Sequence, residues 1–484
     1  MSQVDSAPAL PEKQTSPYRS VLKAVTQHAA EYVDSLDSRP VATTVDLAVL
    51  RKRLRKPLGR DGVPAEEVIR DLVRDVEGGL LGSAGGRFFA WVIGGSLPSA
   101  LAADWLTSTW DQNTGLYACA PAPAVVEEIA GEWLKQILAL PQHASFAFVT
   151  GCQMAHATCL AAARHALLEE RGWNVEERGL AGALAIRILS SDQYHASFDR
   201  AVRFMGLGSS SLRPLSSDDD GRLKPEVLEG ALAADPSTPT IVLLQAGDVN
   251  IGAFDSFPTL ISIARRYGAW VHVDGAFGLW AAASPKYRHL TQGIEAADSW
   301  ATDGHKWLNV PYDCGYAFVA RPEAQRSAMT YRAAYLSHNP EVRDPMDWNP
   351  EFSRRARGFP TYAALRELGT DGVAAMVERC CEHAHSIVMG IGRLPGAQVL
   401  WEPVINQGLV RFLDPKAKDH DRHTDRVIAA LNRTGEAFFG GTTWRGQRAM
   451  RVSVSNWQTS AEDVRRTIGA AEKAMREVQQ GGSV

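Results

Sequence analysis

The chain has 484 residues, of which 45% are hydrophobic and 22% are charged, and its formal net charge is −4 at pH 7. A chain of this length can bury a large core, and it is expected to divide into more than one domain. The small net charge gives no electrostatic reason to expect binding to nucleic acid or to an anionic membrane, so we expect neither partner.

The six cysteines include no Cys-x-x-Cys pair, and no cluster of histidines lies near them. They are therefore interpreted as reduced, buried thiols rather than as disulfides or metal ligands, and no metal site is expected. The chain opens with no signal-peptide pattern, and no apolar run is long enough to cross a membrane. These features favour a cytoplasmic protein.

The first part of the chain is expected to be an extension of the fold rather than its core. Residues 1–18 are polar and contain prolines, which predicts an extended arm. Apolar residues then recur at helical spacing as far as about residue 80. The basic run 51–56 could bind phosphate, but a charge run on a short helix is usually solvated. We assign residues 1–83 to an N-terminal arm and helical segment.

An alternation of strands and helices follows. Short apolar runs near residues 146, 186, 241, 269 and 315 predict buried strands, with helical stretches between them. This order predicts an α/β fold with a mainly parallel central sheet and helices on both faces. We assign residues 84–365 to this large domain.

The last part of the chain has a different pattern. Strands are predicted at 399–404, 407–413 and 449–454, with a helix at 422–434. Thr459 and Glu462 have the spacing of a capping box before a final amphipathic helix. We assign residues 366–484 to a small α/β C-terminal domain.

A carboxylate marks the C-terminal end of one predicted strand. Residues 269–273 (AWVHV) are apolar and rich in β-branched side chains, and Asp274 follows them directly. In open α/β sheets this edge is where ligands bind. A single aspartate at a strand end is more often a turn former or a helix cap, so Asp274 suggests function only together with a partner.

The partner is Lys306, in the segment Asp303-Gly304-His305-Lys306-Trp307. A lysine in this apolar, aromatic setting is expected to lose its proton readily and to form imines with aldehydes. An aspartate for a pyridinium nitrogen and a lysine for an aldehyde are the two protein groups that pyridoxal phosphate requires. The pair therefore indicates this cofactor.

At these residues the sequence resembles the fold-type I, group II pyridoxal-phosphate-dependent amino-acid decarboxylases, which include the aromatic amino-acid and glutamate decarboxylases. The resemblance runs from about residue 85 to about residue 464. It implies that Lys306 holds pyridoxal 5'-phosphate as a Schiff base and that Asp274 pairs with the ring nitrogen. It also implies that Ala276 packs against one face of the ring. Asp303 and His305 are counted with the cofactor-binding residues.

A strand that passes through a glycine into a helix is a second candidate feature. Residues 146–149 precede Gly151, Cys152 and Gln153, which begin a long helical pattern. Free backbone N–H groups at a helix N-terminus form an anion site, and we assign these three residues to the cofactor phosphate. The side chain of Gln153 could bind the phosphate or narrow the pocket.

Two further polar strand ends are expected near the cofactor. The segment SDQYHAS resembles the part of the family in which an imidazole stacks on the cofactor ring, so this role is assigned to His195. Asp248 and Asn250 follow another strand and could reach the ring substituents, although a turn-forming role explains them equally well.

Three positions are assigned to the substrate pocket by resemblance. Trp91, Val92 and Tyr117 lie near the places that line this pocket in the family, partly across a homodimer interface. The register at Tyr117 is ambiguous because Pro121 and Pro123 are both candidate anchors.

Two later segments carry the remaining assignments. Tyr335 matches the family's loop tyrosine, whose phenol can protonate Cα after CO2 is lost, and Tyr331 is its competitor. Arg354 opens the motif SRRAR, in which the family's first arginine approaches the substrate carboxylate. Tight binding of a leaving carboxylate would oppose its loss, so a positional or structural role for Arg354 stays open.

These observations predict a homodimeric enzyme that decarboxylates an L-amino acid, aromatic or aliphatic, since no second cation for an acidic side chain is evident. Oxidative decarboxylation to an aldehyde, or another cleavage at Cα such as transamination, is the alternative. A pyridoxal-phosphate-binding scaffold without turnover is the third hypothesis. The proposed catalytic residues are Lys306, His195, Tyr335 and Asp274.

Overall fold

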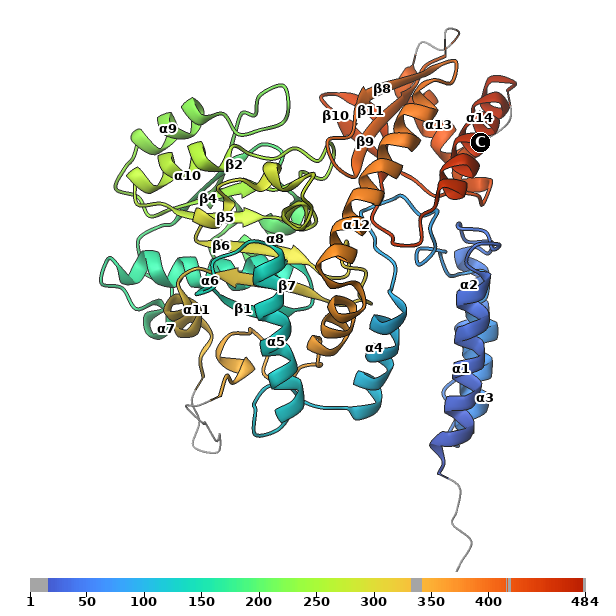
Figure 1. Cartoon of the computed structure of the whole chain (residues 1–484), viewed down its shortest axis with the longest axis horizontal. Coiled ribbons are helices and arrows are strands. Elements are labelled where there is room, and N and C mark those ends of the chain that lie inside the picture. Colours follow the sequence, from blue (N-terminus) through green and yellow to red (C-terminus); the bar gives the residue numbers. More distant parts are fainter. Residues whose placement is uncertain (1–15, 332–341, 415, 417–418, 482–484) are drawn as a thin grey trace, which may run out of the picture. The chain divides into compact units, whose positions relative to one another are not determined.

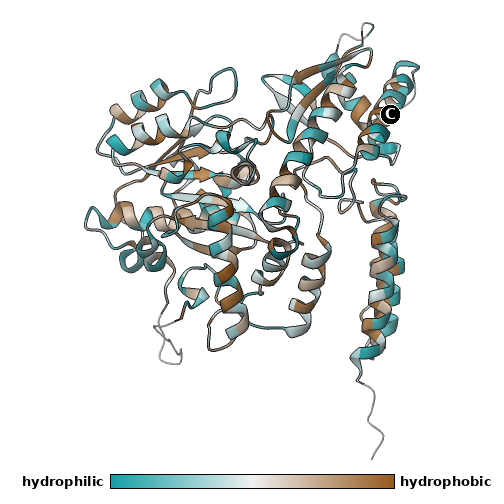
Figure 2. Cartoon of the chain, viewed as in Figure 1, coloured by the Kyte–Doolittle hydropathy of each residue, from teal (hydrophilic) through white to brown (hydrophobic). Residues whose placement is uncertain are grey.

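The computed structural model describes residues 16–481 except 332–341, 415 and 417–418. The chain divides into two compact units between Gly82 and Ser83. Figure 1 traces both units along the sequence, and Figure 2 shows that polar and apolar residues are interspersed along the helices. None of the helices described has both the length and the apolar composition that a membrane span requires.

The first unit contains the helical segment that the sequence predicts. Its helices are α1 (Tyr18–Ser35), α2 (Leu47–Leu54) and α3 (Ala65–Val76). Asp46 caps α2, because its side chain accepts a hydrogen bond from the backbone N of Val49 at 2.9 Å.

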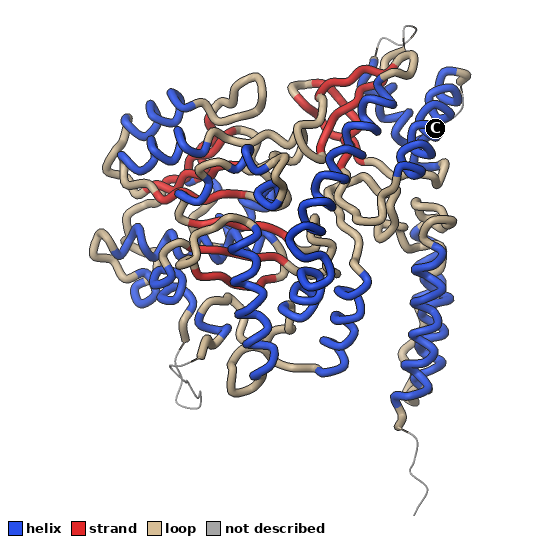
Figure 3. Tube along the Cα trace, viewed as in Figure 1, coloured by secondary structure: helices blue, strands red, loops and turns tan. Residues whose placement is uncertain are grey.

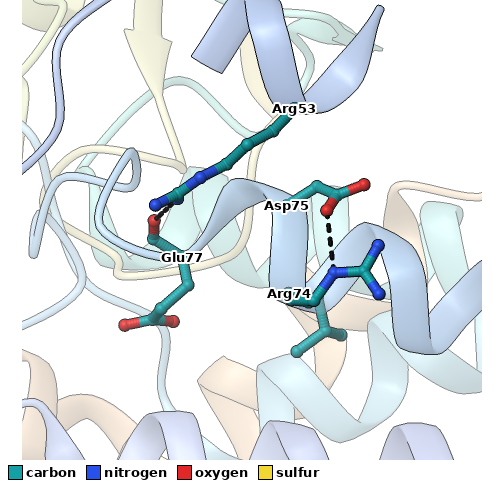
Figure 4. Close-up of a pocket in the computed structure, with 5 residues that line it drawn as sticks. Arg53, Arg74, Asp75 and Glu77 are labelled. Carbon is teal, nitrogen blue, oxygen red and sulfur yellow. Dashed lines mark hydrogen bonds and ion pairs between the residues drawn. The ribbon is translucent and has the colours of Figure 1, made fainter. Parts of the chain in front are cut away.

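Two residues of the basic run at the end of α2, Arg53 and Lys56, are paired with groups of their own unit. Lys56 lies 2.8 Å from Asp71 and 2.6 Å from Asp75 on α3. Arg53 donates to the carbonyl of Glu77 at 2.8 Å, as Figure 4 shows. These contacts favour a solvated, ion-paired face over a phosphate-binding patch.

The second unit is built on a seven-stranded sheet in the order β1-β7-β6-β5-β4-β2-β3. Five of the strands, β3, β2, β4, β5 and β6, are parallel to one another, and β7 is antiparallel to both β6 and β1. The strands are β1 (Ser145–Val149), β2 (Arg187–Ser191), β3 (Leu212–Leu215), β4 (Thr240–Gln245), β5 (Trp270–Asp274), β6 (Ser299–Asp303) and β7 (Gly315–Val319). The expected mainly parallel α/β sheet is confirmed.

Both faces of this sheet are buried. In β4, Val242 and Leu244 belong to one hydrophobic cluster, whereas Ile241 and Leu243 belong to another on the opposite face. Helices cover the strands, as Figure 3 shows. The helices of this part of the unit are α4 (Pro98–Trp110), α5 (Pro121–Ile137), α6 (Cys152–Glu169), α7 (Val175–Arg178), α8 (Ala196–Phe204), α9 (Pro225–Ala233), α10 (Phe257–Arg266), α11 (Pro322–Met329) and α12 (Gly358–Gly392).

A second, four-stranded antiparallel sheet has the order β10-β11-β9-β8. Its elements are β8 (Ala397–Trp401), β9 (Gln407–Phe412), α13 (His420–Arg433), β10 (Gly440–Trp444), β11 (Gln447–Ser453) and α14 (Ala461–Gln479). The proposed boundary between residues 365 and 366 lies inside α12, just before its kink at Gly369.

The capping box of the last helix is shifted by one residue from the prediction. Ser460, not Thr459, is the N-cap, and Asp463, not Glu462, returns the second hydrogen bond. Both pairs have the same spacing, so the pattern could not distinguish them. Thr459 instead donates to the carbonyl of Gly86 at 2.8 Å.

Candidate active site

Asp274 is the last residue of β5, between the neighbouring strands β4 and β6. Its Oδ1 accepts a hydrogen bond from the backbone N of Ala276 at 3.1 Å, and its Oδ2 lies 3.4 Å from Nε2 of His156. Burial alone would raise the pKa of this carboxyl, but His156, His195 and Lys306 outweigh burial and lower the pKa. Asp274 is therefore an ionised carboxylate at a strand end.

Asp303 and Lys306 lie at the same edge of the sheet as Asp274. Asp303 ends β6, and its Oδ2 lies 3.1 Å from Nζ of Lys306. We expected Lys306 to lose its proton readily, and this was wrong. Burial lowers the pKa of Lys306, but the carboxylates of Asp303 and Asp274 outweigh burial, so the pKa of Lys306 is raised. Lys306 is an ammonium ion held by Asp303.

The N-terminus of α6 meets this pair directly. Oδ1 of Asp303 accepts a hydrogen bond from the backbone N of Cys152 at 2.6 Å. Gly151 allows a close approach, because a Cβ there would lie 2.9 Å from Cε1 of His305. Gln153 is partly exposed in the same turn. The first turn of this 18-residue helix, Asp303 and Lys306 therefore form one continuous polar region.

His305 stands beside the lysine, and its position is fixed by its neighbours. Its Nδ1 accepts a hydrogen bond from the backbone N of Cys314 at 3.1 Å, and its ring stacks on Tyr312 with centroids 4.3 Å apart. The backbone N groups of Gly304 and His305 both donate to the carbonyl of Cys314. This turn holds Lys306 at the site.

Asn309, which the sequence analysis did not single out, joins three segments behind Lys306. Its Oδ1 accepts from the backbone N of Gly95 at 2.7 Å and from that of Trp457 at 3.0 Å. Its Nδ2 donates to the carbonyls of Trp307 and Ser455. Asn309 is fully buried and has a φ of 56°, a conformation that asparagine tolerates better than most residues.

His195 is the N-cap of α8 and is exposed. Its Nδ1 accepts a hydrogen bond from the backbone N of Ser197 at 3.2 Å, so the proton of the neutral ring is on Nε2. Desolvation lowers its pKa, Asp274 raises it, and Lys306 and Arg451 lower it further. These mutual effects place His195 in the same electrostatic region as Asp274 and Lys306.

Asp248 has a different environment from the one that a cofactor contact requires. It is 1% exposed, and its carboxylate accepts hydrogen bonds from the backbone N groups of Asn250, Ile251 and Ala253. Burial raises its pKa. Of the two roles left open by the sequence, this geometry favours the turn-forming role.

Arg354 is similarly committed to partners inside the fold. Its side chain is 1% exposed, and its Nη1 lies 2.7 Å from Oε2 of Glu127 on α5. Nη1 and Nη2 also donate to the carbonyls of Thr114 and Phe148. This geometry favours the structural role for Arg354 over contact with a substrate carboxylate.

The three substrate-pocket candidates are not brought together by any contact among the described residues. Trp91 is 53% exposed and packs against Phe438, with ring centroids 5.8 Å apart. Val92 is buried, and both residues have positive φ angles of 57° and 58°. The backbone N of Tyr117 donates to Asp344 at 2.8 Å. Tyr335 lies outside the described residues, and Tyr331 is exposed.

Two buried histidines behind Asp274 were missed. His156 and His272 are fully buried, and Nδ1 of His156 lies 2.9 Å from Nε2 of His272. The sequence carried a signal for both, since His272 is two residues before Asp274 on a strand and His156 is four residues after Cys152 on a helix. Each pair shares a face of its element.

The same region contains potential metal ligands. In the described part of the chain, one group of three potential metal ligands, Cys152, His156 and Asp274, has its ligand atoms within 4.8 Å of one another. Because the carboxylate of Asp274 is also the group that a pyridinium nitrogen requires, a metal ion and this cofactor would compete for it.

The donor set fits pyridoxal phosphate. An ionised carboxylate (Asp274) suits the ring nitrogen, a primary amine (Lys306) suits the aldehyde, and the N-terminus of α6 suits the phosphate. Ala276 is held between Asp274 and Asp303, since its N donates to the carboxylate of Asp274 and its carbonyl accepts from the backbone N of Asp303. These groups come from β5, β6 and α6, which converge at one sheet edge.

Comparison with protein families gives one match that spans most of the chain. Residues 50–412 match the model described as the pyridoxal-dependent decarboxylase conserved domain. The tryptophan decarboxylase 1 of Oryza sativa subsp. japonica is 28% identical over 476 residues, which cover 90% of each sequence. An aromatic-L-amino-acid decarboxylase of Bacillus atrophaeus is 24% identical over 444 residues, again 90% of each. A phenylacetaldehyde synthase of a Rosa hybrid cultivar is 25% identical over 466 residues, 91% of this chain and 90% of the relative.

Solved structures show the same fold. The tryptophan decarboxylase of Oryza sativa with pyridoxal phosphate and tryptamine superposes with a TM-score of 0.90 at 24% identity, covering 97% of this chain and all of that one. The 4-hydroxyphenylacetaldehyde synthase of Rhodiola rosea gives a TM-score of 0.85 at 20% identity, covering 95% and 98%.

Proposed function

We propose that this chain, which belongs to the pyridoxal-dependent decarboxylase family, removes the α-carboxylate of an aromatic L-amino acid as CO2 and releases the amine. Family membership establishes the cofactor, pyridoxal 5'-phosphate, and the reaction type, decarboxylation of an amino acid. The residue roles, the aromatic substrate and the assembly described below are our proposals. The observation that carries them is the convergence of Asp274, Lys306 and the N-terminus of α6 at one edge of the sheet.

The cofactor, when bound, supplies a conjugated ring that takes up the electron pair left at Cα when the carboxylate departs. Asp274 would keep the ring nitrogen protonated, because its own pKa is lowered and it stays ionised. Lys306 would hold the aldehyde carbon covalently, and Oδ2 of Asp303, 3.1 Å from Nζ, would orient its amino group. Gly151, Cys152 and Gln153 would lie at the phosphate, and the backbone N–H of Cys152 would exchange its bond with Asp303 for one with the phosphate.

Two residues are proposed to serve the reacting carbon. His195 would lie against the ring opposite Ala276, and the hydrogen bond from Ser197 to its Nδ1 leaves Nε2 as the proton-bearing nitrogen. Tyr335 would return a proton to Cα with its phenol, with Tyr331 as the alternative. Both assignments rest on the resemblance of their sequence segments to the family.

An aromatic substrate is supported by two independent observations. The relatives described above include a tryptophan decarboxylase and an aromatic-L-amino-acid decarboxylase. Within the chain, Phe88, Trp91 and Phe438 form an aromatic group with ring centroids 5.2 to 5.8 Å apart. Trp91 and Val92 hold an uncommon backbone conformation for their side chains, which is typical of functional segments.

We propose a homodimer because apolar surface is left uncovered within this chain. Helices α1 and α2 contain no buried residue, and Leu22, Val68 and Leu72 are about half exposed, at 50%, 48% and 50%. In the second unit, Trp105 and Trp110 on α4 are 38% and 48% exposed. A second copy of the chain is the partner that would cover such surfaces. The mass of the protein in solution, measured by light scattering, tests whether it is a homodimer.

A cytoplasmic location remains a proposal. It is supported by the six cysteines, all of which are free thiols, five of them buried. Fractionation of cells that express the chain would test it, and recovery in an oxidising compartment would count against it.

The test of the function is incubation of the chain, loaded with pyridoxal phosphate, with a panel of L-amino acids. CO2, amine, ammonia and peroxide are followed together. The proposal predicts CO2 and amine in equal amounts from an aromatic amino acid, with no peroxide. Product from an aliphatic amino acid alone would contradict the substrate class, and no product from any member would favour a non-catalytic scaffold.

Oxidative decarboxylation to an aldehyde is the second candidate, favoured by the similarity to a phenylacetaldehyde synthase. It would give ammonia and peroxide with the aldehyde. The variant Tyr335→Phe separates the two, because removal of the proposed proton donor should divert an amine-forming enzyme toward oxygen-dependent aldehyde formation. Unchanged amine yield without peroxide would count against this role of Tyr335.

A further inference from the structure

A chain of buried side chains connects Asp274 with the core. Nε2 of His156 lies 3.4 Å from Oδ2 of Asp274, and Nδ1 of His156 lies 2.9 Å from Nε2 of His272. Nδ1 of His272 lies 2.9 Å from Oγ of Ser299, which accepts a hydrogen bond from Nε1 of Trp270, also at 2.9 Å. Trp270, His156, His272 and Ser299 are at most 1% exposed, so water cannot replace any of these contacts.

The possible directions of these hydrogen bonds are few. The indole of Trp270 can only donate, so Oγ of Ser299 accepts from it and can donate a hydrogen bond to Nδ1 of His272. His272 then donates from Nε2 to Nδ1 of His156, and His156 carries its proton on Nε2, facing Asp274. In this pattern both histidines are neutral, and the thiol of Cys152, which lies near both Nε2 of His156 and Oδ1 of Asp274, donates to Oδ1.

The reverse direction is less favourable. If His272 donated to Ser299, its Nε2 would accept from Nδ1 of His156, and the lone pair on Nε2 of His156 would face the carboxylate of Asp274. Either the thiol of Cys152, 3.4 Å from this nitrogen, would donate to it instead of to Oδ1 of Asp274, or His156 would carry a second proton and become a fully buried imidazolium ion. The first pattern avoids both, and burial is the main cause that lowers the pKa of His272 to about 3.

We propose that His156 is a positioning residue, held as a neutral Nε2–H tautomer by His272, Ser299 and Trp270, that fixes Asp274 as the carboxylate partner of the cofactor's ring nitrogen. This inference rests on the proposed function. Nε2–H of His156 donates to Oδ2, while Ala276 and the thiol of Cys152 donate to Oδ1 at 3.1 and 3.9 Å. The carboxylate therefore cannot rotate without losing a hydrogen bond, and its negative charge is stabilised on the side away from solvent.

The series of hydrogen bonds from Trp270 through Ser299, His272 and His156 to Asp274 is called the relay below. Its disruption should weaken the interaction with the ring nitrogen and with no other part of the cofactor. A variant that loses the donor at His156 should bind pyridoxal phosphate more weakly. It should bind the analogue that has carbon in place of the ring nitrogen (1-deazapyridoxal phosphate) as well as the unchanged chain does. A defect of folding or of the phosphate site would instead weaken both ligands equally.

The experiment measures the affinity of the full chain, freed of cofactor, for both compounds. His156→Leu removes the donor and should weaken the binding of pyridoxal phosphate about 10-fold to 100-fold, as expected for a hydrogen bond to a charged group, with no change for the deaza analogue. His156→Gln can accept from His272 and donate to Asp274, and it cannot become a cation, so it should restore the affinity to within about 3-fold. Thr158→Val, two residues further along α6 and outside the relay, is the control and should change neither affinity.

Each outcome is decisive. Equal weakening of both ligands by His156→Leu, or no weakening, would overturn the proposal, and a Gln variant as weak as the Leu variant would overturn the neutral tautomer. If His156→Leu does not fold, Ser299→Ala breaks the relay further from the site and should give a smaller loss, confined to pyridoxal phosphate. Failure of the unchanged chain to bind pyridoxal phosphate at all would refute the proposed function instead.

Discussion

Oδ2 of Asp303 lies 3.1 Å from Nζ of Lys306, while the other oxygen of the same carboxylate accepts the backbone N–H of Cys152 at 2.6 Å. Asp303 thus connects the lysine with the N-terminus of α6. It also explains why the pKa of Lys306 is raised although burial lowers it.

Replacing this carboxylate should reverse the effect. In Asp303→Asn the ammonium of Lys306 loses its nearest opposite charge, so its pKa should fall by about 1 to 3 units. The pH dependence of aldehyde binding by Lys306, followed by absorbance, measures this shift. His305→Gln, which leaves Asp303 in place, is the matched control, and a pKa of Lys306 that is unchanged in Asp303→Asn would contradict the assignment.

Asn309 should be important for stability without touching the chemistry. In Asn309→Ala the buried N–H groups of Gly95 and Trp457 lose their acceptor, at a cost of about 1 to 3 kcal/mol each. Unfolding in guanidinium chloride should therefore show a loss of about 3 to 5 kcal/mol.

Asn309→Gly distinguishes the side chain from the backbone. Glycine tolerates the φ of 56° but also lacks the amide side chain. The free energy of unfolding of Asn309→Gly should therefore be lowered about as much as that of Asn309→Ala. A loss below about 1 kcal/mol in both variants would show that these hydrogen bonds contribute little.

The structural role of Arg354 predicts a loss of stability rather than of substrate affinity. Arg354→Met leaves Glu127 buried with Arg343 as its remaining partner at 3.3 Å, and removal of one member of a buried pair costs about 3 to 5 kcal/mol. The adjacent Arg355 pairs with Asp104 at a partly exposed position, so Arg355→Met should change stability by less than about 1 kcal/mol. A KM for the amino acid more than about 10-fold higher in Arg354→Met, at unchanged stability, would restore the substrate-binding role.

Much of this architecture could be predicted from the sequence, because strands with apolar residues on both faces are easily recognised. The runs near residues 146, 186, 241, 269 and 315 correspond to β1, β2, β4, β5 and β7. Strand β6, with the sequence SWATD, was missed because its polar residues hide the pattern, although every residue in it is buried. Because β6 was not recognised, the position of Asp303 at a strand end, which it shares with Asp274, was missed as well.

The roles of individual polar residues were harder to predict. Asp248 and Arg354 carry the right chemical groups for a site, but their partners come from the local turn and from α5, more than 200 residues away in the case of Glu127. Sequence spacing cannot reveal such partners. Conversely, His156 and His272 are brought together by the packing of α6 against β5. In the sequence, only the face of the helix or strand on which each histidine lies indicated this contact.

Acid should destabilise the fold through His272. Its pKa is about 3 in the folded chain, mainly because of burial, and about 6.5 in the unfolded chain. The unfolded state therefore binds the proton first, and stability is lost as the pH falls from about 6.5 toward 3. His272→Gln should lose less stability than the unchanged chain between pH 7 and pH 4, measured by denaturant unfolding. Equal losses in both would mean that His272 is not the group responsible.

The most direct test of the central claim is to locate the bound cofactor. The chain is loaded with pyridoxal phosphate, reduced with borohydride, digested and analysed by mass spectrometry. The account predicts a phosphopyridoxyl group on Lys306, and none at this position in Lys306→Ala, which should also be inactive. Attachment at another lysine, or full decarboxylation by Lys306→Ala, would contradict it.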